Sequence, residues 1–148
     1  MSRIEAKARS AARLAAVQAL YQLDMETPQL PILLDEFHRH RLGAEIEDVE
    51  YLPADIAFFD DIVRGVAARR DEIDGVLTTR LATGWSIARL DKTMLQILRA
   101  GTWELLARAD ISVGTVINEY LDVTHAFFDA REAKFVNGLL DAVAKDVR

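Results

Sequence analysis

The fold class of this chain is decided by one stretch, MLQILRAGTWEL at residues 94–105. Apolar residues recur in and just before it at the three- and four-residue spacing of an amphipathic helix, at Leu90, Met94, Ile97, Leu98 and Leu105. Gly101 falls on the same face, where a small residue lets a neighbouring helix approach closely. We therefore predict one long helix over 85–107 and expect it to be the central, most buried element.

Helical periods also run outward from this stretch in both directions. The further helices that we predict cover 10–25, 32–41, 56–81 with or without a kink, a segment that Ser112 caps, and a last segment from about 136 to 147. Between them, residues 43–53 are expected to form an acidic loop. Three prolines and seven glycines interrupt 148 residues, and no strand pattern stands out, so the sequence predicts an all-α fold of six to seven helices.

The charge of the chain is sorted along its length. The chain carries 24 acidic and 18 basic residues, a net charge of −6, which does not favour nonspecific binding to a polyanion. Residues 45–61 contain acids and no base, whereas residues 1–13 contain Arg3, Lys7, Arg9 and Arg13 against one acid. Because local potential steers a charged partner, the basic N-terminus is a candidate anion-binding segment.

Composition excludes several classes of protein. With no cysteine, disulfides, thiolate metal sites and thiol nucleophiles are excluded. The charged N-terminus lacks the apolar region of a signal peptide, and no apolar run reaches the roughly 18 to 20 residues that cross a bilayer. We expect a soluble, cytoplasmic protein without a membrane partner.

No catalytic constellation stands out in the sequence. None of the four serines lies in a G-x-S-x-G elbow, and no glycine-rich phosphate loop occurs. His38 and His40 would point about 200° apart on a helix, which disfavours a metal site, and adjacent Asp60 and Asp61 diverge by about 100°. A solvated acidic face explains them better, so we expect no enzyme, no metal and no cofactor.

The basic N-terminus has a geometry of its own. On a helical wheel, Arg3 and Lys7 prolong the row of Leu14, Val17 and Tyr21, which we expect to face the core. The first turns then cannot pack on the core, and either project as a helical arm or stay disordered until a polyanion neutralises them. An ordinary solvated terminus explains the charges equally well.

Two other segments suggest contacts with a polyanion. Arg89, Lys92, Gln96 and Arg99 would share one face of the central helix, most simply its wet face, or else a surface for phosphates or carboxylates.

The second segment opens the last helix. Phe135 is either a core residue, which we favour, or a platform for an unpaired base, with Lys134 and Asn137 supplying phosphate and base-edge contacts. Gly138 suggests close approach by a neighbouring helix or a ligand.

Four stretches resemble the signature motifs of the NusB family, in the same order and at comparable spacing. They are AVQALYQ at 16–22, ILRAGTWEL at 97–105, VINEY at 116–120 and KFVNGLLD at 134–141. The resemblance extends over essentially the whole chain. It implies a single NusB-like RNA-binding domain over 1–148, made of two small helical bundles packed together, with residues 1–13 as a basic arm.

The resemblance also implies a function without catalysis. Members of this bacterial family are transcription antitermination adaptors that bind the boxA element of nascent ribosomal RNA together with NusE, a small-subunit ribosomal protein. The pair helps to load other Nus factors onto RNA polymerase. Some relatives are dimers, and the sequence leaves a homodimer open. One departure is that alanines and a serine dilute the basic segment here, where some members have nearly continuous arginines.

The site residues implied by the resemblance form two groups. The RNA-binding candidates are Arg3, Lys7, Arg9, Arg13, Gln18, Tyr21, Lys134, Phe135 and Asn137. The candidates for the face toward the protein partner are Arg99, Trp103, Glu104, Asn118 and Glu119, some of which could instead be structural.

Two rival interpretations remain. A similar domain occurs at the N-terminus of ribosomal RNA cytosine methyltransferases, but a glycine-rich segment for the methyl donor is absent from this sequence. The other rival is a helical bundle that binds only protein through a groove. RNA retention that depends on salt would distinguish it from the adaptor.

Overall fold

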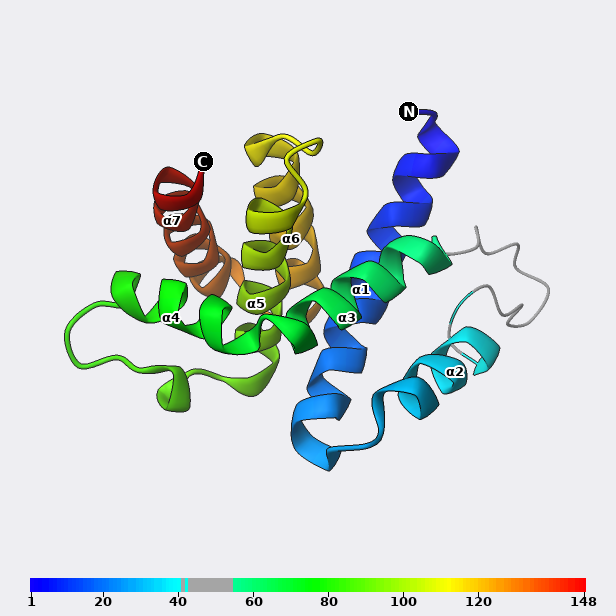
Figure 1. The fold of residues 1–148 in the computed structure, drawn as a ribbon. Helices are drawn as coiled ribbons and strands as arrows, with labels where there is room; N and C mark the ends of the chain where they lie inside the picture. The colour runs from blue at the N-terminus through cyan, green and yellow to red at the C-terminus, as the bar shows by residue number, and fades with distance from the viewer. Residues whose placement is uncertain (41, 43–54) are drawn as a thin grey trace. The chain divides into compact units, whose positions relative to one another are not determined.

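The computed structural model describes residues 1–40, 42 and 55–148, and the described residues form seven α-helices, one short 3₁₀ helix and no strand (Figure 1). The helices are α1 (Arg3–Glu26), α2 (Leu30–His40), α3 (Ile56–Ala68), α4 (Arg70–Arg80), η1 (Ile87–Arg89, the 3₁₀ helix), α5 (Lys92–Ala107), α6 (Val113–Phe127) and α7 (Ala130–Val147). The all-α prediction is confirmed. The acidic loop expected at 43–53 lies outside the described residues.

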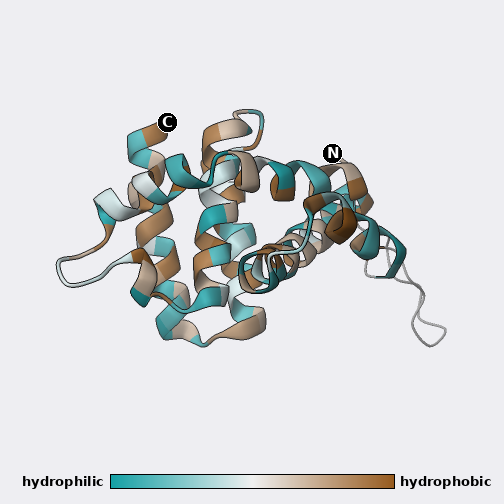
Figure 2. Cartoon of the chain, turned by 60° about the horizontal axis from the view of Figure 1, so that its bottom comes forward, coloured by the Kyte–Doolittle hydropathy of each residue, from teal (hydrophilic) through white to brown (hydrophobic). Residues whose placement is uncertain are grey.

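The chain divides into two compact units, Met1–Arg64 and Gly65–Arg148. Figure 2 shows polar and apolar residues interleaved along the helices, as expected for amphipathic helices with one face on a core. Within the described ranges, no helix is both long and apolar enough to cross a lipid bilayer.

Helix α1 begins earlier than the sequence predicts. The Ser2 hydroxyl accepts a hydrogen bond from the Glu5 backbone N–H at 3.1 Å, so the helix starts at Arg3 and not at residue 10. It ends at Glu26, and the next residue, Thr27, takes a left-handed conformation with φ of 49° before Pro28. The whole basic segment is therefore helical, as the helical-arm alternative requires.

Small residues form most of the buried face of α1. The buried apolar residues of α1 are Ala12, Ala15, Ala16, Val17, Ala19 and Leu20. Of the row expected to face the core, Val17 is buried, but Leu14 is only half-buried and Tyr21 is 40% exposed. The predicted core row is therefore wrong for Tyr21, because small alanine side chains a few positions away make the close contacts.

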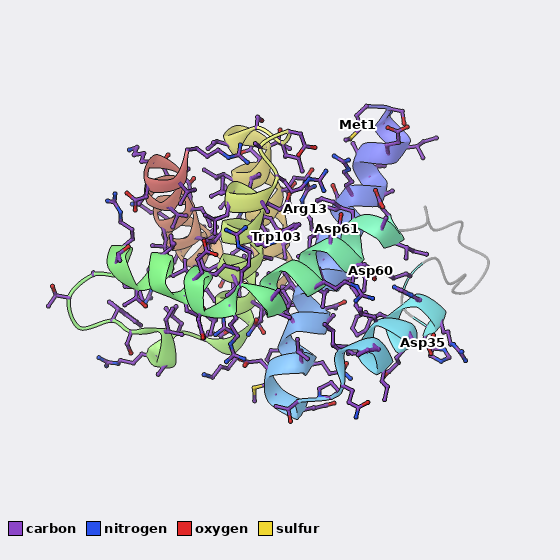
Figure 3. All side chains as sticks on the ribbon, viewed as in Figure 1. Met1, Arg13, Asp35, Asp60, Asp61 and Trp103 are labelled. Carbon is purple, nitrogen blue, oxygen red and sulfur yellow. The ribbon has the colours of Figure 1, made fainter. Side chains whose placement is uncertain are left out.

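An aromatic contact joins α2 to the first half of α3. The rings of Phe37 and Phe59 stack with centroids 5.5 Å apart and planes 21° apart, and both are fully buried. Beside them, His38 Nε2 lies 2.6 Å from Asp60 Oδ1. Figure 3 labels Asp60 and its neighbour Asp61 on α3. Asp60 thus pairs with a histidine while Asp61 is exposed, as expected for two carboxylates that do not share a site.

Helix α5 is the centre of the second unit, and α4, α6 and α7 pack against it. Every residue from Met94 to Leu105 is buried, which confirms that this is the central helix. A Cβ built on Gly101 would lie 3.1 Å from the Leu140 methyl carbons, so the predicted close approach of a neighbouring helix is also confirmed. Gly65 plays the same part, and the Trp103 indole occupies the space beside it.

The prediction of one helix over 85–107 is wrong at its N-terminal end. Residues Ile87–Arg89 form η1, and α5 begins only at Lys92. The reason is Asp91, whose carboxylate accepts hydrogen bonds from the Thr93 and Met94 backbone N–H groups and so caps the helix. Trp85 consequently lies in an irregular segment, and Arg89 is not on the α5 face.

The predicted wet face of this helix is also wrong. Gln96 is 1% exposed and Arg99 is 3% exposed. The Arg99 guanidinium donates to both carboxylate oxygens of Asp74 at 2.8 Å, because α4 covers this face of α5. The segment 56–81, predicted as one helix with or without a kink, consists of two separate helices, α3 and α4, on either side of Arg69.

The C-terminal residue closes the second unit. The Arg148 guanidinium donates hydrogen bonds of 2.6 to 3.1 Å to the carbonyl oxygens of Leu105, Ile111, Glu104 and Arg108. The Glu104 and Leu105 carbonyls belong to the last turn of α5, where carbonyl groups begin to lack intrahelical donors, although the Glu104 carbonyl also accepts the Arg108 backbone N–H at 2.9 Å. One arginine side chain therefore donates hydrogen bonds to the carbonyl oxygens at the C-terminal end of the central helix.

An exposed ion pair joins α4 to α7. Arg80 hydrogen-bonds to Asp146, and this bond, together with the opposite charge, lowers the pKa of the Asp146 carboxyl. Because a depressed carboxyl pKa favours the folded state only where the carboxyl is ionised, this contribution is present above the pKa of the unfolded chain. It is lost as the pH falls through the lower pKa of the folded chain.

The substitution Gly65→Ala is expected to destabilise the protein by about 1–3 kcal/mol, because the new methyl would lie 2.1 Å from Trp103 Nε1 and force the indole to move. The matched control is Gly75→Ala on α4, where a Cβ meets nothing within 4 Å. It should stabilise the protein by about 0.5–1 kcal/mol, since alanine is the better helix former. Urea unfolding measures both, and equal effects of the two substitutions would contradict the packing described for Gly65.

Candidate nucleic-acid interface

The candidate residues of α1 fall on two faces of the helix. At about 100° per residue, Arg3, Lys7, Gln18 and Tyr21 lie within about 60° of one another in one row. Arg13 lies about 80° from the edge of this row, and Arg9 lies about 120° from it. All four residues of the row are exposed. The row carries two cations at the N-terminal end of the helix and Gln18 and Tyr21 further along, with the half-buried Leu14 between the two pairs.

Arg9 and Arg13 lie against the start of α3. Their guanidinium carbons lie 5.1 and 4.9 Å from the centroid of the Phe58 ring, within the range of cation–π contacts. Arg9 Nε is also 3.9 Å from an oxygen of Asp55, whose backbone N–H donates to the Ala8 carbonyl at 3.0 Å. These contacts hold both arginines in fixed positions.

The two arginines differ in what they can reach. The Arg9 side chain is 24% exposed and can meet a phosphate from its present position. Arg13, labelled on α1 in Figure 3, is 2% exposed and contributes to packing in this structure. Its part in RNA binding stays a prediction, with the structure favouring a supporting role beneath Arg9.

The C-terminal candidates cluster on the first half of α7. Lys134 and Asn137 are exposed, and Phe135 is half-buried with its ring centroid 6.5 Å from that of Trp85. Phe135 is therefore neither a closed core residue nor a free platform. A Cβ on Gly138 would meet nothing within 4 Å, so close packing by a described helix does not explain this glycine.

The candidates for a protein partner divide by burial. Asn118 is exposed and Glu119 is half-buried, so α6 presents both toward solvent. Arg99, Trp103 and Glu104 are 3%, 6% and 0% exposed. Glu104 accepts a hydrogen bond from the Tyr120 hydroxyl, and the contacts of all three buried residues are structural. The partner face therefore stays a prediction that rests mainly on Asn118 and Glu119.

Sequence reasoning did not single out three residues that lie near Phe135. Trp85, Arg131 and Glu132 border the same pocket as Phe135. The available signal was Trp85 itself, a large aromatic residue in the irregular stretch TGWS at 83–86. Because a continuous helix was predicted over 85–107, Trp85 was not recognised as a candidate.

No metal centre emerges from the described part of the chain. It contains no group of three or more histidine, cysteine, aspartate or glutamate side chains that could hold a metal ion. The His38 imidazole, the first residue considered as a ligand, lies against Asp60 and the edge of Phe59.

Comparison with known proteins decides the family. A family model described as the NusB family matches residues 10–145. The chain belongs to the NusB family. The transcription antitermination protein NusB of Novosphingobium aromaticivorans is 75% identical over 148 residues, which are 100% of both chains. NusB of Sphingopyxis alaskensis is 65% identical over 143 residues, covering 97% of this chain and 96% of that protein.

The similarity extends to the three-dimensional structure. A crystal structure of antitermination factors NusB and NusE in complex with double-stranded RNA aligns with this chain at a TM-score of 0.77 and 26% identity. The alignment covers 99% of each chain. The NusB-like fold predicted from the four motifs is therefore confirmed.

The substitution Asp74→Ala is expected to destabilise the protein by about 3 kcal/mol, because it leaves the Arg99 guanidinium buried without its carboxylate. Asp71→Ala, on the exposed side of the same helix, is the control and should cost less than about 1 kcal/mol. Thermal or urea unfolding measures both. If Asp74→Ala proves as mild as Asp71→Ala, Arg99 is not held as a structural cation.

Proposed function

We propose that this chain is a transcription antitermination adaptor that binds boxA-type single-stranded RNA of nascent ribosomal RNA transcripts together with NusE. The observation that carries the proposal is the full-length identity of 75% to a transcription antitermination protein NusB. The structure aligned above, which contains NusB, NusE and RNA, supports joint binding of RNA and protein. Its RNA is double-stranded, and the single-stranded boxA target comes from the family resemblance.

The surfaces of the chain are suited to this role. The exposed row of α1 offers cations for phosphates and Tyr21 for stacking. On another face of the same helix, Arg9 is partly exposed and rests on Phe58. The acidic balance of the whole chain favours a basic protein such as a ribosomal protein as partner. Both units together would act as one NusB domain.

The remaining parts of the proposal follow from this role. The chain works as a cytoplasmic binding protein without catalysis or cofactor, and it contributes to an RNA polymerase complex through other Nus factors. A homodimer is compatible with the exposed row of α1, which a second copy could cover while RNA and partner are absent.

RNA binding by the isolated chain should be weak and should tighten when NusE is present. Few cations face solvent on α1, and each phosphate contact adds only about one unit to the dependence of log K on log salt. Titration of a labelled boxA-type RNA, with and without NusE and against a scrambled RNA, tests this expectation. Equal affinities with and without NusE would refute the shared binding surface, and retention of neither RNA would leave the protein-binding module as the better interpretation.

The double substitution Arg3→Ala with Lys7→Ala should lower the slope of log K against log salt by roughly 2 in the complex with NusE, because two phosphate contacts are lost. Arg39→Ala on α2 is the control, since Arg39 is exposed but pairs with Asp35 at 3.1 Å. Binding measured at several salt concentrations gives the slopes. A slope that the double substitution leaves unchanged would remove the α1 row from the RNA surface.

A further inference from the structure

The start of α3 lies against the basic segment of α1, and both belong to the first compact unit. Asp55, which directly precedes α3, donates its backbone N–H to the Ala8 carbonyl of α1 at 3.0 Å. Its side chain accepts the Phe58 backbone N–H at 2.9 Å and so caps the first turn of α3. These two hydrogen bonds fix the Asp55 carboxylate beside the cations of α1.

The two oxygens of this carboxylate have different neighbours. Asp55 Oδ1 is the atom that caps α3, whereas Oδ2 lies 3.9 Å from Arg9 Nε. This separation is longer than a hydrogen bond, so the contact is an ion pair without a directional bond. The Arg9 and Asp55 side chains are 24% and 35% exposed, so an anion from solvent can reach the same guanidinium.

Phe58 keeps the Arg9 guanidinium next to the carboxylate. The Arg9 Cζ atom lies 5.1 Å from the centroid of the Phe58 ring, and this ring is 3% exposed. The Arg13 Cζ atom lies 4.9 Å from the same centroid, and Arg13 is 2% exposed. Because a buried ring and a buried second guanidinium restrict its positions, Arg9 stays beside Asp55 as long as no other anion binds it.

A phosphate that binds Arg9 must therefore compete with Asp55. The ion pair already exists in the free chain, and the phosphate either displaces the carboxylate or is repelled by it. Partly exposed ion pairs of this kind change a binding constant by about two- to fivefold. The carboxylate is thus placed to lower the affinity of α1 for a polyanion.

We propose that Asp55 is an autoinhibitory group of the α1 surface: it neutralises Arg9 in the free chain, and an RNA phosphate replaces it when RNA binds. The inference rests on the proposed function and names a contact that regulates it. Because a phosphate contact carries no sequence information, Asp55 lowers the affinity for every RNA by a similar factor. The free chain is thereby kept a weak RNA binder, and the contacts that NusE adds raise the affinity.

The test is the substitution Asp55→Asn, measured by fluorescence anisotropy of labelled boxA-type RNA with the full chain and NusE at low salt. Asparagine retains the cap of α3 and loses the charge, so the RNA is expected to bind about two- to fivefold more tightly. A scrambled RNA should show an increase by the same factor. Asp55→Ser, a second neutral capping residue, should change the affinity in the same direction, and thermal unfolding shows that each variant is folded at the assay temperature.

The salt dependence separates this effect from a structural one. Salt screens a partly exposed ion pair, so the increase caused by Asp55→Asn should become smaller as the salt concentration rises. An increase that came from a rearranged α3 would not follow the screening of this pair. In the Arg9→Ala background, Asp55→Asn should change the affinity by less than about 1.5-fold, because the cation that it frees has been removed.

Asp35→Asn is the matched control, because it also removes an acid that pairs with an arginine. Asp35 lies 3.1 Å from Arg39 on α2, and Figure 3 shows Asp35 well apart from Arg13 on α1. The affinity for RNA should stay unchanged in this variant. Its behaviour shows whether the loss of one negative charge anywhere in the first unit is enough to strengthen RNA binding.

Three results would overturn the proposal. They are unchanged or weaker RNA binding by folded Asp55→Asn and Asp55→Ser, an equal increase with Asp35→Asn, and an increase that persists in the Arg9→Ala background. The same titrations separate this inference from the proposed function. If the unsubstituted chain with NusE binds boxA-type RNA while the neutral variants bind no more tightly, the autoinhibitory role alone fails; if no variant binds RNA, both fail.

Discussion

Complete burial of α5 is the constraint on which the second unit depends. Each residue from Met94 to Leu105 is buried, so this helix has no wet face and needs neighbours on every side. Polar side chains inside must then find partners, and Arg99 obtains Asp74 from α4 while Glu104 obtains the Tyr120 hydroxyl from α6. The positions of the helices packed on α5 therefore follow from the burial of one sixteen-residue helix, at 92–107.

The charges of the chain show a second regularity, since several cations that look free in the sequence are held by the fold. Arg99 is held by the half-buried carboxylate of Asp74, Arg148 by backbone carbonyls, and Arg9 by Phe58 and Asp55. What remains on α1 is a small exposed set that includes Arg3 and Lys7. An acidic adaptor of this kind would gain RNA affinity from a few placed contacts and from its partner, and not from its overall charge.

The structural features that the sequence predicted correctly are those that depend on hydrophobic periodicity and on helix capping. The all-α class, the central helix, Gly101 and the Ser112 cap all agree with the structure. It failed where a tertiary contact overrides the local pattern: α4 buries the supposed wet face of α5, alanines replace Tyr21 in the packing of α1, and Asp91 stops the helix that was extended to Trp85. The pocket beside Phe135 could not be predicted, because it joins a loop to a helix more than forty positions further along the chain.

Ultraviolet cross-linking of a boxA-type RNA to the complex of this chain with NusE, followed by mass spectrometry of the cross-linked peptides, tests the central claim most directly. The account predicts cross-links in the α1 peptide that contains Tyr21 and in the α7 peptide that contains Phe135, both reduced by high salt. Cross-links confined to α2 or to the exposed side of α4, or found only on NusE, would contradict the claim that these surfaces bind RNA.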